Sequence, residues 1–438
     1  MRDAVESHPL WKHVGFRPTG RHVRAALLFL PNFVLAKGAI YLLPLAIAAL
    51  APAQVYGSIE LAVSIGLLAS TVTVGIPMGG MNQVYLVRGE RRIVDQVAAI
   101  VLIGCSVASL LAVGAYLLDL DPTSVMVMAS LGVAVVHQVG ASASRMLSWR
   151  NLAAWTDGIA MLAAGALILV LIAFEGSPSL TGMTLGYLLL GALATIATAI
   201  LLVAIRKPGL RERLRTCVKL GLPMTIFALL GIWLSVGGRI LVGLFNATDL
   251  AAYSVAFRVA GITLGIHQLA ATALFAKLYS ARTREADKLL TLFFVAVGVA
   301  TAAVAVAGRA VPELIGLSAL DARGVAAYRA VLPLAGIHTF YWIGFGMVQL
   351  RINRYGLAQR TILPTLLISV AGIALICGVA MFYSTDIVLL SWLIAFYAAA
   401  FFFANTLVLA RRGLPHRRLT NTGIFGGLLL LALALVLG

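Results

Sequence analysis

The sequence predicts an all-α, polytopic membrane protein, and three observations lead to this fold class. Of the 438 residues, 61% are hydrophobic and only 11% are charged, and the mean hydropathy is +1.00. Soluble domains carry roughly 25% charged residues, so this chain has too few charges to cover a surface in water. Apolar stretches of about 20 residues, the length that an α-helix needs to cross a bilayer, recur along nearly the whole chain. These stretches do not alternate apolar and polar residues as a transmembrane β-barrel does.

Thirteen stretches are candidate spans, so we expect 12 to 13 transmembrane helices. The first six lie near residues 25–50, 54–77, 95–118, 122–146, 152–174 and 181–205. The other seven lie near residues 219–245, 249–276, 288–308, 324–349, 360–382, 386–410 and 421–437. No connection between them is long enough to fold as a soluble catalytic domain, and we therefore expect a protein that is not an enzyme.

Lysine and arginine are concentrated in alternate connections. The connection at residues 206–219 is the most basic, whereas those at residues 119–121 and 246–249 contain neither residue type, and the one at 309–323 is mixed. This alternation follows the positive-inside rule and predicts a cytoplasmic N-terminus. The topology also accounts for the net charge of +17, so we expect no nucleic-acid partner.

The two groups of six spans resemble each other. Leu30-Pro31 opens the first span and Leu222-Pro223 opens the seventh, and both His137 and His338 are followed thirteen residues later by an arginine. Six spans return the chain to the same side, so both halves start from the cytoplasm, as parallel repeats do. We expect two parallel six-helix bundles around a central cavity; chance similarity between apolar runs is the alternative. The predicted organisation is a cytoplasmic N-terminal segment (1–24), an N-terminal bundle (25–205), a basic linker (206–218), a C-terminal bundle (219–410) and a basic loop with an extra helix (411–438).

Four of the charged residues inside predicted spans are candidates for a functional site. Lys37 is near the middle of the first span, where a cation costs roughly 3 kcal/mol on insertion scales. Arg239 and Arg258 lie in the seventh and eighth spans, at similar depths from their outer ends, and Glu60 lies at a comparable depth in the second span. The excess of cations over carboxylates indicates a pathway for something anionic.

Several connections resemble those of the oligosaccharide flippases in the multidrug/oligosaccharidyl-lipid/polysaccharide exporter superfamily. They are the turn from Ala51 to Gly57, its counterpart from Asn246 to Tyr253, and the run Gly75-Ile76-Pro77 with the amphipathic stretch at 82–89. The resemblance covers the whole chain in organisation, although none of these motifs is specific and a thirteenth span departs from the usual twelve.

This resemblance implies two six-helix bundles forming a V around a central cavity. It implies that the substrate is a polyprenyl-diphosphate-linked oligosaccharide, moved from the cytoplasmic to the outer leaflet by alternating access for cell-surface polysaccharide biosynthesis. The implied location is the bacterial cytoplasmic (inner) membrane, as a multi-pass protein among membrane lipids. A polysaccharide polymerase or another assembly protein is a candidate partner, and no cofactor is implied.

With a diphosphate as ligand, the intramembrane cations gain candidate roles. Lys37 would hold the diphosphate as a point charge, or else would fix helix packing through a carbonyl or carboxylate. Arg239 and Arg258 would bind the diphosphate with their planar forks. Alternatively, they would extend to the outer headgroups, or pair with Glu60 as a gate that holds the two halves together on the outside.

Histidines and glutamines inside spans are weaker candidates. His137, His267 and His338 could bind a coupling proton, because histidine titrates near neutral pH, or they could simply pack. Gln138 and Gln268 could bond sugar hydroxyls or bridge helices. No metal-ligand spacing and no nucleotide-binding P-loop occurs in the sequence.

The alternative to a flippase is a cation-coupled multidrug exporter of the same superfamily. Cationic drugs need carboxylates in the cavity, and Glu60 is the one clear candidate. A major-facilitator transporter also has two parallel halves, but the run at 88–92 lacks the preceding aspartate of that class. A polysaccharide polymerase or ligase would need a large outer loop, and the connection at 309–323 is too short.

Overall fold

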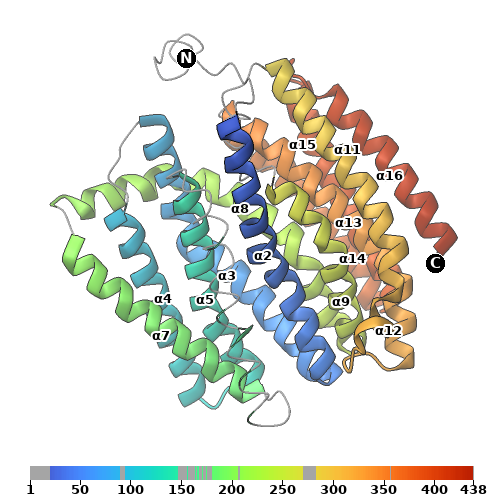
Figure 1. Cartoon of the computed structure of the whole chain (residues 1–438), viewed down its shortest axis with the longest axis horizontal. Helices are drawn as coiled ribbons and strands as arrows, with labels where there is room; N and C mark the ends of the chain where they lie inside the picture. Colours follow the sequence, from blue (N-terminus) through green and yellow to red (C-terminus); the bar gives the residue numbers. More distant parts are fainter. Residues whose placement is uncertain are drawn as a thin grey trace.

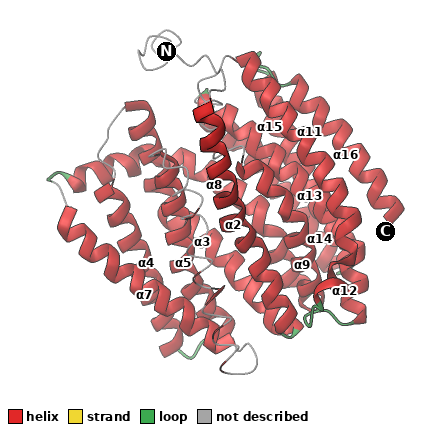
Figure 2. Ribbon diagram, in the orientation of Figure 1, coloured by secondary structure: helices red, strands yellow, loops and turns green. Residues whose placement is uncertain are grey.

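The structure is a computed structural model that describes residues 20–88, 94–146, 180–205, 208–269, 283–355 and 357–437, with isolated residues between 155 and 174. Within these residues every regular element is a helix and no strand occurs (Figure 2). The predicted all-α fold is therefore confirmed.

The described α-helices follow one another along the chain (Figure 1). In the first half they are α2 (Gly20–Leu50), α3 (Ala53–Arg88), α4 (Val94–Leu117), α5 (Pro122–Met146) and α7 (Leu180–Ile205). In the second half they are α8 (Leu210–Phe245), α9 (Leu250–Ala260), α11 (Thr283–Ala307), α12 (Val311–Ile315), α13 (Ala322–Arg354), α14 (Ala358–Phe382), α15 (Ile387–Ala410) and α16 (Arg417–Leu437). Three short 3₁₀ turns join them, η2 (Ala247–Asp249), η3 (Gly261–Thr263) and η4 (Gly308–Ala310).

Twelve helical stretches of the described chain are long and apolar enough to cross a membrane. They coincide with twelve of the thirteen predicted spans, and this confirms the polytopic fold. The span predicted at 152–174 and residues 1–19 of the predicted N-terminal segment lie outside the described ranges, apart from the isolated residues.

Some helices extend well beyond the apolar stretch that predicted them. Helix α3 continues through Pro77 to Arg88, and α8 begins at Leu210, after Gly209 turns the chain with φ 77°. A helix satisfies its own backbone hydrogen bonds in water as well as in lipid, so it does not end where the hydrocarbon ends. The stretch predicted as a basic linker at 206–218 is thus helical from residue 210 onward.

Helices α3 and α8 form an antiparallel pair over their whole length, which we call the α3–α8 seam. Near one end, a Cβ atom on Gly80 would lie 1.7 Å from the carbonyl oxygen of Cys217, and one on Gly221 would lie 1.7 Å from that of Ile76. Only glycine allows two backbones to approach this closely. Near the other end, Gly243 faces Leu61. The seam joins a helix of the first half to a helix of the second.

The same helix pairs recur in both halves. Helix α3 packs on α5 as α9 packs on α13, and α4 packs on α5 as α11 packs on α13. Between the halves, α3 packs on α8 as α9 packs on α2. In Figure 1, α2 runs between the group of α4, α5 and α7 and the group that contains α11 to α16. These helix pairs therefore repeat between the two halves.

One end of the bundle is joined by polar contacts between connections. We call it the outer end, after the orientation predicted from charge; it carries residues 51–52, 246–249, 316–321 and 383–386. The carbonyls of Ala48 and Ala49, at the end of α2, accept hydrogen bonds from the Ala319 amide (2.9 Å) and the Ser318 hydroxyl (2.7 Å). These bonds satisfy carbonyls that a helix end leaves unpaired. They tie a first-half helix to a second-half connection.

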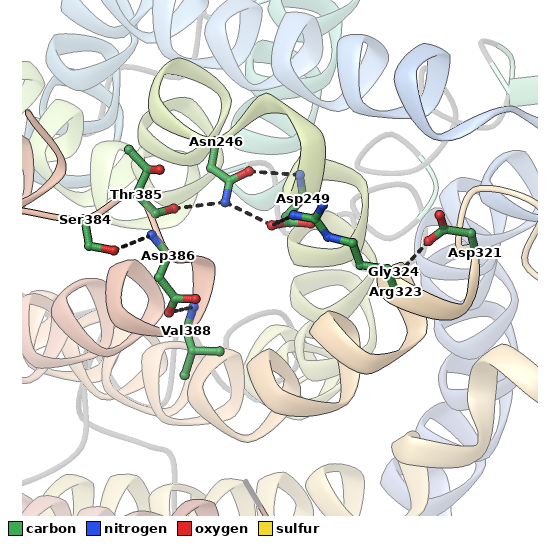
Figure 3. A network of polar contacts seen from close by, with 9 residues as sticks. All are labelled: Asn246, Asp249, Asp321, Arg323, Gly324, Ser384, Thr385, Asp386 and Val388. Atoms are coloured by element: carbon green, nitrogen blue, oxygen red, sulfur yellow. Dashed lines mark hydrogen bonds and ion pairs between the residues drawn. The ribbon is translucent and has the colours of Figure 1, made fainter.

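Further polar contacts join three connections of the second half at the outer end (Figure 3). The Asn246 side chain donates to Asp249 (3.0 Å) and to the Thr385 carbonyl (2.9 Å). Asp249 also lies 3.5 Å from Arg323 at the start of α13. The outer end is held together by hydrogen bonds as well as by apolar packing.

The last helix, α16, packs tightly against the second half. Gly423, Gly426 and Gly427 lie against Phe402, Phe340 and Tyr341, and a Cβ atom on Gly427 would lie 1.8 Å from the Tyr341 hydroxyl. That hydroxyl donates to the Gly423 carbonyl at 3.1 Å. The thirteenth predicted span is therefore an integral part of the fold.

Candidate functional site

Glu60 lies in the second turn of α3, close to the outer end. Its side chain is buried, at 2% exposed, and the hydroxyl of Tyr56, one turn earlier, donates to its Oε1 at 3.1 Å. Positions i and i+4 share one face of a helix, so α3 directs both side chains the same way. That face meets α8 and α9 of the second half.

Two arginines of the second half converge on this carboxylate. The Nη1 of Arg239, from α8, donates to Oε2 of Glu60 at 2.6 Å. Arg258, from α9, binds the same carboxylate in a bidentate manner, with Nε at 3.0 Å from Oε1 and Nη2 at 2.9 Å from Oε2. Charge-assisted, bidentate bonds of this kind are among the strongest hydrogen bonds in proteins. We call Glu60, Arg239 and Arg258 the outer latch.

The outer latch has two cations for one anion. Arg239 is only 6% exposed, and its guanidinium carbon lies 5.1 Å from the centre of the Phe257 ring, which adds a cation–π contact. The formal sum is one excess positive charge in a region shielded from water. An isolated buried charge is costly, so the latch presents an attractive environment for a further anion.

Lys37 lies on α2 and is 3% exposed. It has an interaction partner of its own. Its neighbours Phe33 and Ala36 pack against Trp155 and Leu269. The described contacts bring Arg239 and Arg258 together through Glu60, but they do not include Lys37 in that group.

The remaining candidates are dispersed, with one exception. The Gln138 amide donates to the Leu67 carbonyl (3.1 Å) and to the Thr71 hydroxyl (2.9 Å), so it bridges α5 and α3. His137, on α5, is half-buried and has an interaction partner. His267 and Gln268 are half-buried near the end of the eighth span, where His267 lies against Gly346.

His338 is the exception, because it lies beside the outer latch. It lies on α13 and is 2% exposed, and its ring centre lies 5.2 Å from that of Phe257. The guanidinium of Arg239 lies over the same Phe257 ring. Its Nε2 is 2.7 Å from the Leu234 carbonyl oxygen of α8.

Sequence reasoning missed several residues that shape this region. Phe257 precedes Arg258 and stacks on Tyr253, but no sequence signal distinguishes it from ordinary apolar packing. At the opposite, inner end of the seam, the buried Asp95 of α4 pairs with Arg213 of α8, a pair that sequence reasoning also missed. In the described part of the chain, no three His, Cys, Asp or Glu side chains are grouped so as to hold a metal ion.

Comparisons with known proteins identify the fold. No family model matches the chain, and no curated protein matches it in sequence. A mutant of the Vibrio cholerae MATE transporter VcmN is similar in structure, with a TM-score of 0.53 and 15% identity over 87% of this chain and 94% of that one. A chain described as "protein A" is similar with a TM-score of 0.57 and 15% identity over 91% and 97%. The chain therefore has the polytopic helical fold of which VcmN is an example.

Proposed function

We propose that this protein is a transporter that moves a polyprenyl-diphosphate-linked oligosaccharide from the cytoplasmic to the outer leaflet by alternating access. The observation that carries the proposal is the charge of the outer latch. Two arginines and one glutamate leave an excess positive charge inside the bundle, at the contact between the two halves. A diphosphate is the part of such a substrate that a buried pair of guanidiniums recognises.

The same observation bears on the alternative, a multidrug exporter for organic cations. Such a substrate needs a carboxylate that is free to bind it. In the described spans, Glu60 is the one carboxylate away from the helix ends, and two arginines already occupy both of its oxygens. The fold does not separate the two functions, because VcmN shares it. The occupied carboxylate favours an anionic substrate.

In the proposed cycle the outer latch closes the outer end while the substrate is bound from the cytoplasm. Glu60 belongs to the first half, and Arg239 and Arg258 belong to the second, so the latch breaks when the halves separate on the outside. The two guanidiniums then lose their carboxylate, and the diphosphate is an anion that can replace it. Lys37, at a deeper level, would hold the diphosphate before this exchange.

The test is the flipping of a fluorescent polyprenyl-diphosphate sugar by the protein in proteoliposomes. Arg258→Gln and Lys37→Ala should each reduce the rate at least tenfold. Arg323→Gln is the matched control, because Arg323 lies at the same end but is largely exposed, and its rate should stay within twofold of wild type.

Efflux of an organic cation such as ethidium is measured in parallel. Ethidium efflux without any diphosphate-lipid flipping would overturn the proposal and support the drug exporter. Normal flipping by Lys37→Ala would retain the function and remove Lys37 from the binding path.

A further inference from the structure

His338 offers one basic atom to a ligand. Its Nε2 lies 2.7 Å from the Leu234 carbonyl oxygen. A carbonyl can only accept a hydrogen bond, so Nε2 carries the hydrogen, and in the neutral ring Nδ1 keeps a free lone pair. Nδ1 is buried and has no hydrogen-bond partner among the described residues. A buried polar atom without a partner is rare and calls for an explanation.

The groups around His338 make a positive charge on its ring unfavourable while the latch is closed. Arg239 of α8 contacts the same Phe257 ring that His338 contacts. From α9 come Arg258, bound to Glu60, and Tyr253, whose hydroxyl is unbonded in the described structure. A proton on Nδ1 would add a cation beside the excess charge of the latch, and Nδ1–H would have no acceptor.

Among the side chains that the structure describes, the other helices against α13 bring no free anion to His338. Asp287 of α11 pairs with Arg351, and Tyr397 of α15 donates its hydroxyl to Ser369. The basic residues of α14 and α16, which are exposed, are Arg360, Arg417 and Arg418. Glu60, which both latch arginines engage, remains the nearby carboxylate.

From this geometry we infer that Nδ1 of His338 is a proton-binding site whose occupancy opens the outer latch. The bound proton and the packed latch exclude each other. Protonation requires that Nδ1 gains an acceptor, such as water, and that Arg239 moves away, and both changes occur when the outer end opens. Proton binding therefore favours the open outer end, and its release favours the closed one. The inference concerns the latch and does not depend on which substrate the protein carries.

The experiment measures the width of the outer end as a function of pH. Spin labels are attached to Leu120→Cys and Tyr383→Cys, which are exposed at the outer end of the first and second halves. The three native cysteines are replaced by alanine. Distances are measured in proteoliposomes from pH 8.5 to 5.5. One short distance is expected at pH 8.5. The ratio of open to closed molecules should rise by up to tenfold per pH unit as the pH falls, the limit for one linked proton.

His338→Gln is the decisive variant, because its amide can still donate to the Leu234 carbonyl but does not titrate. It should keep the short distance at every pH. His267→Gln, on another part of the second half, should respond as the wild type does. A His338→Gln protein with the wild-type pH response would overturn the inference, and so would a wild type without any response.

A second measurement guards against a variant that fails to fold. Hydrogen–deuterium exchange at the imidazole C2 position, read by mass spectrometry on the wild-type chain, follows the protonation of His338 directly. Its midpoint should coincide with the midpoint of the distance change. Opening of the outer end while His338 stays neutral would refute the assignment.

Discussion

Replacement of Glu60 by glutamine tests the outer latch. The glutamate accepts three bonds from guanidinium groups, at 2.6, 2.9 and 3.0 Å, and is itself 2% exposed. Glutamine is similar in size, but one of its oxygens becomes an NH₂ group that faces the guanidinium donors, and two arginines are left without an anion. Removal of one partner from a buried ion pair costs about 3–5 kcal/mol. Glu60→Gln should therefore destabilise the closed outer end by about that amount.

A loss of 3 kcal/mol or more corresponds to at least about a hundredfold shift toward open molecules, at 1.4 kcal/mol per tenfold. The spin-label pair at positions 120 and 383 measures this shift at pH 8.5. Glu313→Gln is the control, because Glu313 also pairs with an arginine, Arg329, but both side chains are substantially exposed. An exposed pair contributes about 0–1 kcal/mol, so the distances should not change. A Glu60→Gln protein that is as closed as wild type would refute the role of the latch.

Three further predictions concern helix packing away from the latch and the start of one helix. Gly221→Leu places a side chain against the Ile76 backbone and should lower the melting temperature by at least several degrees, since overpacking costs about 1–3 kcal/mol or more. The control is Gly378→Leu, whose side chain meets only open space and should leave the melting temperature unchanged. Gly427→Leu should detach α16, visible as faster amide hydrogen exchange along that helix, with the outer latch intact. Hydrogen bonds from Ser124 lower the pKa of Asp121 below its ordinary value of 3.8. The first turn of α5 should therefore keep its exchange protection above that pH and lose it as the pH falls through the lowered pKa.

Sequence alone predicts the helices well, because each apolar stretch of about 20 residues must form a helix in lipid. It also predicts that Glu60, Arg239 and Arg258 lie at comparable depths, since depth follows from the 1.5 Å rise per residue. Depth does not decide between a diphosphate and a carboxylate as the partner of the arginines. That choice depends on the rotation of α3, α8 and α9 about their axes, which only the structure gives.

Residues whose contacts the sequence leaves open share a physical reason. The sequence allows Gln138 either to bond sugar hydroxyls or to bridge helices, and in the structure its amide bonds to Leu67 and Thr71 of the neighbouring helix. Polar groups in a bundle must be satisfied, and a neighbouring helix satisfies them as readily as a substrate does. The close contact of Gly80 with Cys217 likewise gives no sequence signal, because glycine is frequent in membrane helices.

The two ends of the α3–α8 seam are held by different forces, and this difference bears on how the protein could alternate. At the inner end the contact between α3 and α8 themselves is steric, because Gly80 and Gly221 bring two backbones together. The ion pair near this end joins Asp95 of α4 to Arg213 of α8 and lies outside the α3–α8 contact. At the outer end the contact is ionic, with Glu60 facing Arg239 and Arg258.

An ion pair inside a bundle changes its energy by several kcal/mol when an anion or a proton arrives, whereas a packed interface does not. A ligand can only shift an equilibrium through an interaction that differs between the two states. The outer latch is such an interaction, so ligands should control the opening of the outer end directly, and the inner end should follow through the rigidity of α3 and α8.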